Sequence, residues 1–303
     1  MGAADSSDAN LQQLLSKLKL KGWLDEQMGK ALQTLRKMIG NNYTVALPNN
    51  ESLDLIWIPA GTFLMGSPDG EIGRNKDTEG PQTKVLLTKG FWLGKYKVTQ
   101  SQWESVTGVT QQQLADRDKQ ENPDSQWHKV RYIKPNLYPQ NPVFFVTWNE
   151  SMSFCQKLTD QERAAGRLPQ GYEYTLPTEA EWEYACRAGT TGSTSGDINQ
   201  MALYNLSGEA FKFHPVGQKQ ANSWGLFDMY GNVEEWCRNW YLEYPGGNLI
   251  NPLGPASGQY RIVRSSGIGS TSDAVRSASR RWAGPAQRLF GVGFRLALTP
   301  FLQ

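Results

Sequence analysis

The residues of this 303-residue chain that could carry out redox or metal chemistry are three cysteines and two histidines. Cys155 and Cys186 lie in stretches with a helical pattern, and Cys237 follows a tryptophan. Three thiols cannot form a complete disulfide framework, and free cysteine commonly packs as a small core side chain. His128 and His214 are far apart in the sequence, and two such histidines make a poor metal site. We therefore expect buried structural thiols and no catalytic histidine.

Arginine is the other residue type that could do chemistry here, and it is concentrated near the C-terminus. The stretch from Arg261 to Leu298 holds seven arginines and a single acid, Asp273. Mostly small residues separate the arginines, with neither a helical nor a strand period. Such a run cannot bury a continuous apolar stripe, so we expect an ordered loop. Ordered loops on a rigid scaffold commonly carry binding surfaces.

The elements that must position these residues are predicted from periodicity. Apolar residues at helical spacing predict a helical hairpin over residues 8–40, and residues 53–108 are strand-rich. Three further helices are predicted, at residues 99–106, 149–162 and 178–188. Thr178 and Glu181 form a capping box at the start of the last one. Beyond residue 140 we expect at most two substantial helices.

Two long stretches lack a clear period. Residues 109–140 form a polar insert with three prolines, and loops of this length are usually functional or disordered. After residue 188 the chain is dominated by Gly, Ser, Asn and Trp, so loops and large aromatic side chains must build the core there. We assign a helical segment to residues 1–50 and one domain to residues 51–303.

Composition narrows the class of protein. The net charge of +2 is too small to indicate nucleic acid or an anionic membrane as a partner. No apolar run approaches the length of a membrane span, and the N-terminus shows no signal peptide. We expect a protein that lies at a cell surface or is secreted if a targeting segment was removed, and a cytoplasmic protein otherwise.

Six motifs, in order along the chain, resemble the formylglycine-generating-enzyme (sulfatase-modifying factor) family. The first is the strand and turn IWIPAGTFLMGS at residues 56–67. The others lie at residues 96–103, 142–148, 176–185, 225–236 and 293–295. This resemblance implies an α+β protein with an irregular, loop-rich C-type-lectin-like fold of the formylglycine-generating-enzyme type.

The resemblance does not extend to the family's chemistry. Formylglycine-generating enzymes oxidise a substrate cysteine with two cysteines near their C-terminal motif, and the matching stretch here, residues 264–295, has no cysteine. The related sulfoxide-forming branch builds an iron site from several histidines, whereas this chain has two. We therefore expect a protein that is not an enzyme. The alternatives are an enzyme or enzyme-derived regulator of the formylglycine-generating-enzyme and sulfoxide synthase family, and a plain interaction domain.

The C-terminal segment is most similar to the variable proteins of diversity-generating retroelements, in which a reverse transcriptase mutates adenines of a template. Outside residues 261–298 the chain has 17 Asn and 16 Lys, whose codons are rich in adenine, and the segment has none. Mutation away from adenine would produce this bias, and so would a preference for the fork geometry of arginine. The fixed frame implied by the resemblance is Arg261, Arg264, Ala274, Arg276, Ala278, Arg280, Pro285, Arg288, Gly293, Phe294 and Arg295. Ser265 and Ser266 depart from it, since many relatives carry two glycines there.

The positions between the frame residues are predicted to form one contiguous exposed patch that binds a protein or glycan ligand on another cell. Trp and Arg are frequent binding anchors, and an exposed apolar cluster marks a binding site. The predicted ligand-binding residues are Gly267, Ile268, Gly269, Ser270, Thr271, Ser272, Asp273, Val275, Ser279, Arg281, Trp282, Ala283, Gly284, Ala286, Gln287, Leu289, Phe290 and Gly291. Five of the frame arginines should be more buried than these residues, bonding loop carbonyls and carboxylates: Arg264, Arg276, Arg280, Arg288 and Arg295.

No cofactor is predicted to be required, but the resemblance implies that one loop could hold a structural calcium ion. The loop DMYGNVEE at residues 228–235 matches a family loop that binds calcium through carbonyl and carboxylate oxygens, the hard ligands that this ion prefers. By position, the ligands would come from Asp228, Gly231, Val233 and Glu235. Structural hydrogen bonding by the same residues is the alternative.

Overall fold

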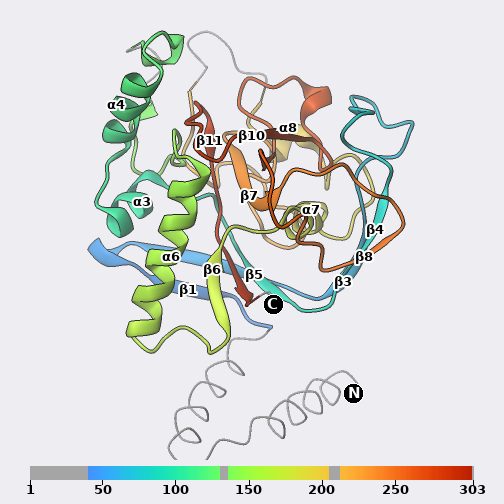
Figure 1. The fold of residues 1–303 in the computed structure, drawn as a ribbon, viewed down its shortest axis with the longest axis horizontal. Coiled ribbons are helices and arrows are strands. Elements are labelled where there is room, and N and C mark those ends of the chain that lie inside the picture. The colour runs from blue at the N-terminus through green and yellow to red at the C-terminus, as the bar shows by residue number, and fades with distance from the viewer. Residues whose placement is uncertain (1–39, 130–135, 205–211, 302–303) are drawn as a thin grey trace, which may run out of the picture. The chain divides into compact units, whose positions relative to one another are not determined.

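The computed structural model describes residues 40–129, 136–204 and 212–301 (Figure 1). The helical hairpin predicted over residues 8–40 lies outside these residues, except for Gly40. The chain divides into one unit up to Ile39 and a second from Gly40 onward. The boundary predicted at residue 50 was wrong, because Tyr43–Ala46 forms strand β1 of the second unit and pairs antiparallel with Ser52–Leu55.

Three curled sheets make the framework, together with loops that follow no regular pattern. The largest sheet has the strand order β1-β2-β5-β12-β6, the second β10-β9-β7-β11 and the third β3-β4-β8. The strands are β1 (Tyr43–Ala46), β2 (Ser52–Ile58), β3 (Gly61–Met65), β4 (Thr83–Leu87), β5 (Phe91–Gly94), β6 (Tyr172–Thr175), β7 (Glu234–Trp240), β8 (Asn248–Ile250), β9 (Arg261–Arg264), β10 (Arg280–Ala283), β11 (Val292–Gly293) and β12 (Ala297–Pro300). The last strand lies between β5 and β6, so the C-terminal segment is part of the framework at its end.

Helices are few and each long one begins at a threonine cap. They are α3 (Gln100–Thr107), α4 (Gln111–Glu121), α6 (Trp148–Ala164), α7 (Glu179–Arg187) and the short α8 (Ile198–Met201), with 3-10 turns η1 (Pro48–Asn50), η2 (Gln126–His128) and η5 (Ser272–Ala274). The predicted capping box of Thr178 and Glu181 is confirmed. In the described residues beyond 140, α6 and α7 are the two substantial helices, as predicted.

The insert at residues 109–140 contains regular structure that the sequence analysis did not assign. Its 11-residue helix α4 starts with a capping box of Thr110 and Gln113 and buries Gln111, Leu114, Ala115 and Asp118. The buried positions follow helical spacing, but two of the four are polar, which hid the pattern. Figure 1 shows α4 beside α3 and α6, at one side of the domain.

Helix α7 lies at the centre of the domain, and all nine of its residues are buried. Its apolar side chains, such as Trp182 and Cys186, belong to the main core. Figure 1 shows the helix end-on beside β7. Because Glu179 and Glu183 lie on the same helix, the core also contains carboxylates, and buried carboxylates need cationic partners.

Candidate ligand-binding surface

The C-terminal segment is built as two strands and two loops. Strands β9 and β10 pair antiparallel, with Arg264 opposite Arg280. Between them lies the first loop, residues 265–279, whose regular structure is limited to η5. The second loop, residues 284–291, leads from β10 to β11. The prediction of an ordered loop is therefore confirmed for these two stretches and wrong for the strands. Strands β9 and β10 bury only Ile262, Val263 and Ala283 as apolar residues, too few to show a period in the sequence.

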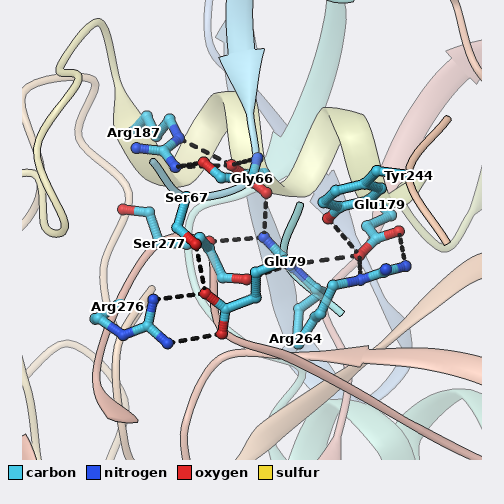
Figure 2. A network of polar contacts seen from close by, with 12 residues as sticks. Gly66, Ser67, Glu79, Glu179, Arg187, Tyr244, Arg264, Arg276 and Ser277 are labelled. Carbon is cyan, nitrogen blue, oxygen red and sulfur yellow. Dashed lines mark hydrogen bonds and ion pairs between the residues drawn. The ribbon is translucent and has the colours of Figure 1, made fainter. Parts of the chain in front are cut away.

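Like charges directly opposite each other destabilise a sheet. Carboxylates of helix α7 compensate the positive charges of Arg264 and Arg280. The Arg280 guanidinium binds both carboxylate oxygens of Glu179, at 2.6 and 2.8 Å. Arg264 donates to the Glu183 carboxylate at 2.6 Å and to the carbonyls of Ser277 and Ala278. Figure 2 shows Arg264 and Glu179 in this network. The two arginines thereby attach β9, β10 and the first loop to the core helix.

Arg276 anchors the tip of the first loop. Its two terminal nitrogens each lie 2.7 Å from one carboxylate oxygen of Glu79 (Figure 2). Arg276 also binds the Glu71 carboxylate. Burial alone would raise the pKa of the Glu79 carboxyl, but its hydrogen bonds and ion pair with Arg276 hold that pKa below the ordinary value. This loop is consequently fixed by a charged pair that is almost completely removed from solvent.

Arg288 and Arg295 hold the second loop and its continuation. Arg288 donates to the Glu150 carboxylate at 2.6 and 3.0 Å, to Glu121 and to a backbone carbonyl. Arg295 binds the buried Glu235 at 2.7 and 3.0 Å. All five arginines Arg264, Arg276, Arg280, Arg288 and Arg295 are buried, so the prediction that the frame arginines lie beneath the surface is confirmed.

Most of the predicted ligand-binding residues lie at the surface. The exposed ones are Gly269, Thr271, Ser272, Asp273, Trp282, Ala286 and Gln287. The half-buried ones are Gly267, Ser270, Ser279, Arg281, Gly284, Leu289 and Phe290. Together they occupy both loops and strand β10, and they include the exposed ring of Trp282, which packs on Tyr241 with ring centroids 4.2 Å apart.

Four predicted positions are buried, and for these the predicted exposure was wrong. They are Ile268, Val275, Ala283 and Gly291. Ile268 is held by its backbone NH, which donates to the carbonyl of Asn232, and its side chain is 2 % exposed. Val275 joins the main core. Loops this irregular still need apolar contacts beneath them, and the sequence offers no period that separates such contacts from exposed residues.

Two fixed parts of the domain border the segment, and the sequence analysis did not connect either with it. The loop between β3 and β4 reaches the first loop so closely that a Cβ at Gly73 would overlap the carbonyl oxygen of Asp273. The insert reaches the second loop, where the ring of Trp127 stacks on Phe290 with centroids 4.6 Å apart and planes inclined by 2°. The first loop is therefore in contact with the β3–β4 loop at Asp273, and the second loop with the insert at Phe290.

The chemistry of the three thiols fits a structural role. Cys155, Cys186 and Cys237 are free and buried. Burial raises the pKa of Cys186 to about 11 and also raises the pKa of Cys155 and of Cys237, so the reactive thiolate form is disfavoured. In the part of the chain that the structure describes, no three His, Cys, Asp or Glu side chains are grouped as metal ligands.

The predicted calcium loop is already bound by a cation of the protein itself. The Lys97 ammonium donates to the carbonyl of Val233 at 2.7 Å and to the Glu235 carboxylate at 2.6 Å. Glu235 also accepts from Arg295 and Trp182, and one carboxylate oxygen of Asp228 accepts from a backbone NH. Burial opposes ionisation of Glu235, but Arg295 and Lys97 lower its pKa to about 2. The oxygens of Val233 and Glu235 do not fit a calcium ion in this arrangement.

The fold and its ordered motifs define the class of protein. Residues 43–300 match the model of the Sulfatase-modifying factor enzyme 1-like domain, and the chain belongs to this family. The fold is the irregular C-type-lectin-like fold of the formylglycine-generating-enzyme type, as predicted. No helix among the described residues is long and apolar enough to span a membrane.

The proteins and solved structures that are similar to this chain carry different names. The chain is 26 % identical to the formylglycine-generating enzyme of Bos taurus, over 80 % of this chain and 74 % of that enzyme. It is 29 % identical to the serine/threonine-protein kinase pkn1 of Chlamydia caviae over 90 % of this chain, but it spans only 43 % of the kinase. The structure of Treponema denticola variable protein 1 superposes with a TM-score of 0.68 at 25 % identity, covering 86 % of this chain and 99 % of that one. PvdO from Pseudomonas aeruginosa, at 24 % identity and a TM-score of 0.66, covers 86 % of this chain and 98 % of its own and shares the fold.

Proposed function

We propose that this protein is a non-enzymatic ligand-binding protein whose C-terminal segment is diversified by a retroelement. One observation carries the proposal. Within the C-terminal segment, five arginines are buried and bound to carboxylates, whereas residues between them are exposed. A domain whose surface changes at many positions stays folded only if few of those positions support the core. Substitutions at buried positions cost about 2–5 kcal/mol, and the total stability of a domain is about 5–15 kcal/mol. The likeness to a variable protein supports this reading.

The ligand would be a protein or glycan on another cell. Such a role places the domain at the cell surface or outside the cell, which fractionation of the source cells tests. The segment offers both an exposed ring, Trp282, and exposed polar side chains, which suit recognition of either class. Changes at these residues should alter which ligand is bound and leave the framework unchanged.

The test compares two display libraries of equal size, each randomised at four predicted ligand-binding positions. The first varies Thr271, Ser272, Trp282 and Ala286, which are exposed, and the second varies Ile268, Val275, Ala283 and Gly291, which are buried. Most members of the first library should stay folded, as judged by protease resistance, and panning on an immobilised protein and on a glycan-coated surface should yield binders. Equal loss of folding in the two libraries would contradict the proposal.

Two further measurements separate the proposal from the alternative of an enzyme. A near-copy of codons 261–298 that differs at adenines, beside a gene for a reverse transcriptase, would identify the source of diversity. Incubation with a cysteine-containing sulfatase peptide and copper should give no formylglycine product. Turnover of that peptide would instead support an enzyme of the formylglycine-generating-enzyme family.

For the loop at residues 228–235 we propose that the Lys97 ammonium replaces calcium. A chelator should then leave the melting temperature unchanged, and added calcium should not raise it. Lys97→Met should lower it, because Glu235 loses one of its two cationic partners. A rise of several degrees on addition of calcium to the wild-type protein would show that the ion binds there after all.

A further inference from the structure

One arginine of the C-terminal segment is partnered unlike the other six. Arg264, Arg276, Arg280, Arg281, Arg288 and Arg295 each form an ion pair with a glutamate. Arg261 forms none with the described residues. Its guanidinium carbon instead lies 3.6 Å from the ring centroid of Trp148 and 3.3 Å from that of Trp240. The cation is thus sandwiched between two aromatic rings.

The hydrogen bonds of this guanidinium are also incomplete. Nη1 donates to the carbonyl of Arg238 at 2.7 Å, while Nε is buried without a partner. Nη2 makes no hydrogen bond with the described residues. Burial, followed by the nearby positive charge of Arg238, lowers the pKa of Arg261 to about 10. Arg261 is half-buried, and cations that are withdrawn from water are normally paired, so the charge of Arg261 is undercompensated.

The sandwich borders the loops that carry the exposed residues. Arg261 lies opposite Ala283 in the β9–β10 pair, and the second loop begins at the next residue. The backbone NH of Asn149, next to Trp148, donates to the carbonyl of Pro285 in that loop. A ligand resting on Ala286 or Gln287, both exposed, would therefore reach the vicinity of the guanidinium.

We propose that Arg261, Trp148 and Trp240 form a fixed slot that binds a carboxylate of the ligand, beside the changeable residues. This inference rests on the proposed function, because it names the chemistry of one part of the same surface. A guanidinium binds a planar carboxylate through parallel N–H donors, and here Nη1 and Nη2 are the donors with capacity left. The two rings hold the guanidinium in place, so little side-chain freedom is lost when a ligand binds.

The rings themselves offer the ligand little. Both faces that line the slot are in contact with the guanidinium, so a sugar ring cannot stack there. The slot therefore recognises the carboxylate group, which an acidic side chain or a uronic acid supplies.

The experiment follows the tryptophan indole NH signals of the full chain by NMR, with Trp148 and Trp240 assigned by phenylalanine variants. The probes are N-acetylglutamate and glucuronate, with chloride at equal ionic strength as reference. We expect saturable shifts of the two assigned signals with the carboxylates and none with chloride. A stronger response to N-acetylglutamate or to glucuronate identifies an acidic peptide or a sugar acid as the natural source.

Three variants separate the slot from a purely structural sandwich. Arg261→Gln should weaken carboxylate binding at least tenfold. Arg163→Gln, which removes an exposed arginine paired with Asp160 on helix α6, should leave it unchanged. If Arg261→Gln fails to fold, Arg261→Lys serves in its place, because it retains the charge. It should bind the carboxylate more weakly than the wild-type protein, because the guanidinium fork is lost. Absence of saturable shifts in the wild-type protein, or shifts that persist in Arg261→Gln, would overturn the slot. Binders from the display library would still stand in that case.

Discussion

The two loops of the C-terminal segment are held by the same residue type against carboxylates of different exposure. In the first loop, Arg276 is paired with side chains that are 2 % and 7 % exposed, Glu79 and Glu71. In the second loop, Arg288 is paired with Glu150 and Glu121, which are 23 % and 47 % exposed. The first loop is therefore fastened to the interior of the domain and the second to its margin.

The difference teaches how one surface combines a rigid part with an adjustable part. Breaking a pair whose partner remains buried leaves an uncompensated charge and costs more than breaking an exposed pair. The second loop compensates with aromatic contacts, because Phe290 lies against Phe144, Phe213 and the insert's Trp127. We expect the first loop to tolerate change only at its surface side chains, and the second loop to respond also to changes in the insert.

The largest effect is expected for Arg280→Ala, because it leaves the buried Glu179 carboxylate without its bidentate partner. We predict a loss of about 3–5 kcal/mol in the free energy of unfolding, the range for breaking a buried pair. Arg281→Ala is the matched control, since its pair with Glu234 is partly exposed, and it should cost no more than about 1 kcal/mol. Urea denaturation of both variants measures the two values, and equal losses would contradict the distinction between buried and exposed pairs.

The comparison of the two loops is tested directly by Arg276→Ala and Arg288→Ala. We expect Arg276→Ala to lower the free energy of unfolding by about 3 kcal/mol or more. For Arg288→Ala we expect about 1–2 kcal/mol, because water can reach Glu121 and Glu150. Added salt should weaken only the contribution of Arg288, since buried pairs are screened less. The reverse order of the two losses would show that exposure does not set the strength of these anchors.

Acid should weaken both anchors. The pKa values of Glu79 and Glu150 are lowered in the folded protein, chiefly because Arg276 and Arg288 overcome the effect of burial, and that of Glu235 is about 2. A lowered folded-state pKa contributes stability above the unfolded value of 4.5, and this stability is lost as the pH falls toward the folded-state pKa. The free energy of unfolding, measured in urea, should therefore fall between about pH 4.5 and pH 2. Glu79→Gln and Glu150→Gln should each remove one part of that dependence, and an unchanged pH profile in both would contradict this origin.

Much of the fold followed from the sequence because its signals are local or occur in a fixed order. Helical spacing marked α3, α6 and α7, the capping box of Thr178 and Glu181 marked the start of α7, and the ordered motifs indicated the family. Arg264, Arg276, Arg280, Arg288 and Arg295 were also expected to be supports, because the resemblance places them in the fixed frame. Their burial confirms that reading.

The partners of those arginines could not be predicted, because they come from distant parts of the chain. Glu79, Glu150 and Glu179 lie 197, 138 and 101 residues away from the arginines that they bind, and no spacing rule connects them. The same holds for Ile268, whose burial depends on a backbone contact with Asn232. The calcium loop looked complete by position, and only the fold reveals that Lys97 reaches it.

The smallest effect is expected at Ser265, the residue that begins the first loop. Ser265 adopts a left-handed backbone with a φ of 69°, a conformation that costs a residue with a Cβ about 1 kcal/mol and glycine little. Many relatives carry glycine there by resemblance, so Ser265→Gly should raise the free energy of unfolding by up to about 1 kcal/mol. Thermal melts of Ser265→Gly and of Ser266→Gly, its matched control without a positive φ, measure the difference. The control should be neutral or slightly destabilising, because its hydroxyl donates to the carbonyl of Ala274 at 2.6 Å. If Ser265→Gly lowers the melting temperature instead, the serine side chain itself supports the turn, and the first loop depends on more than its arginines.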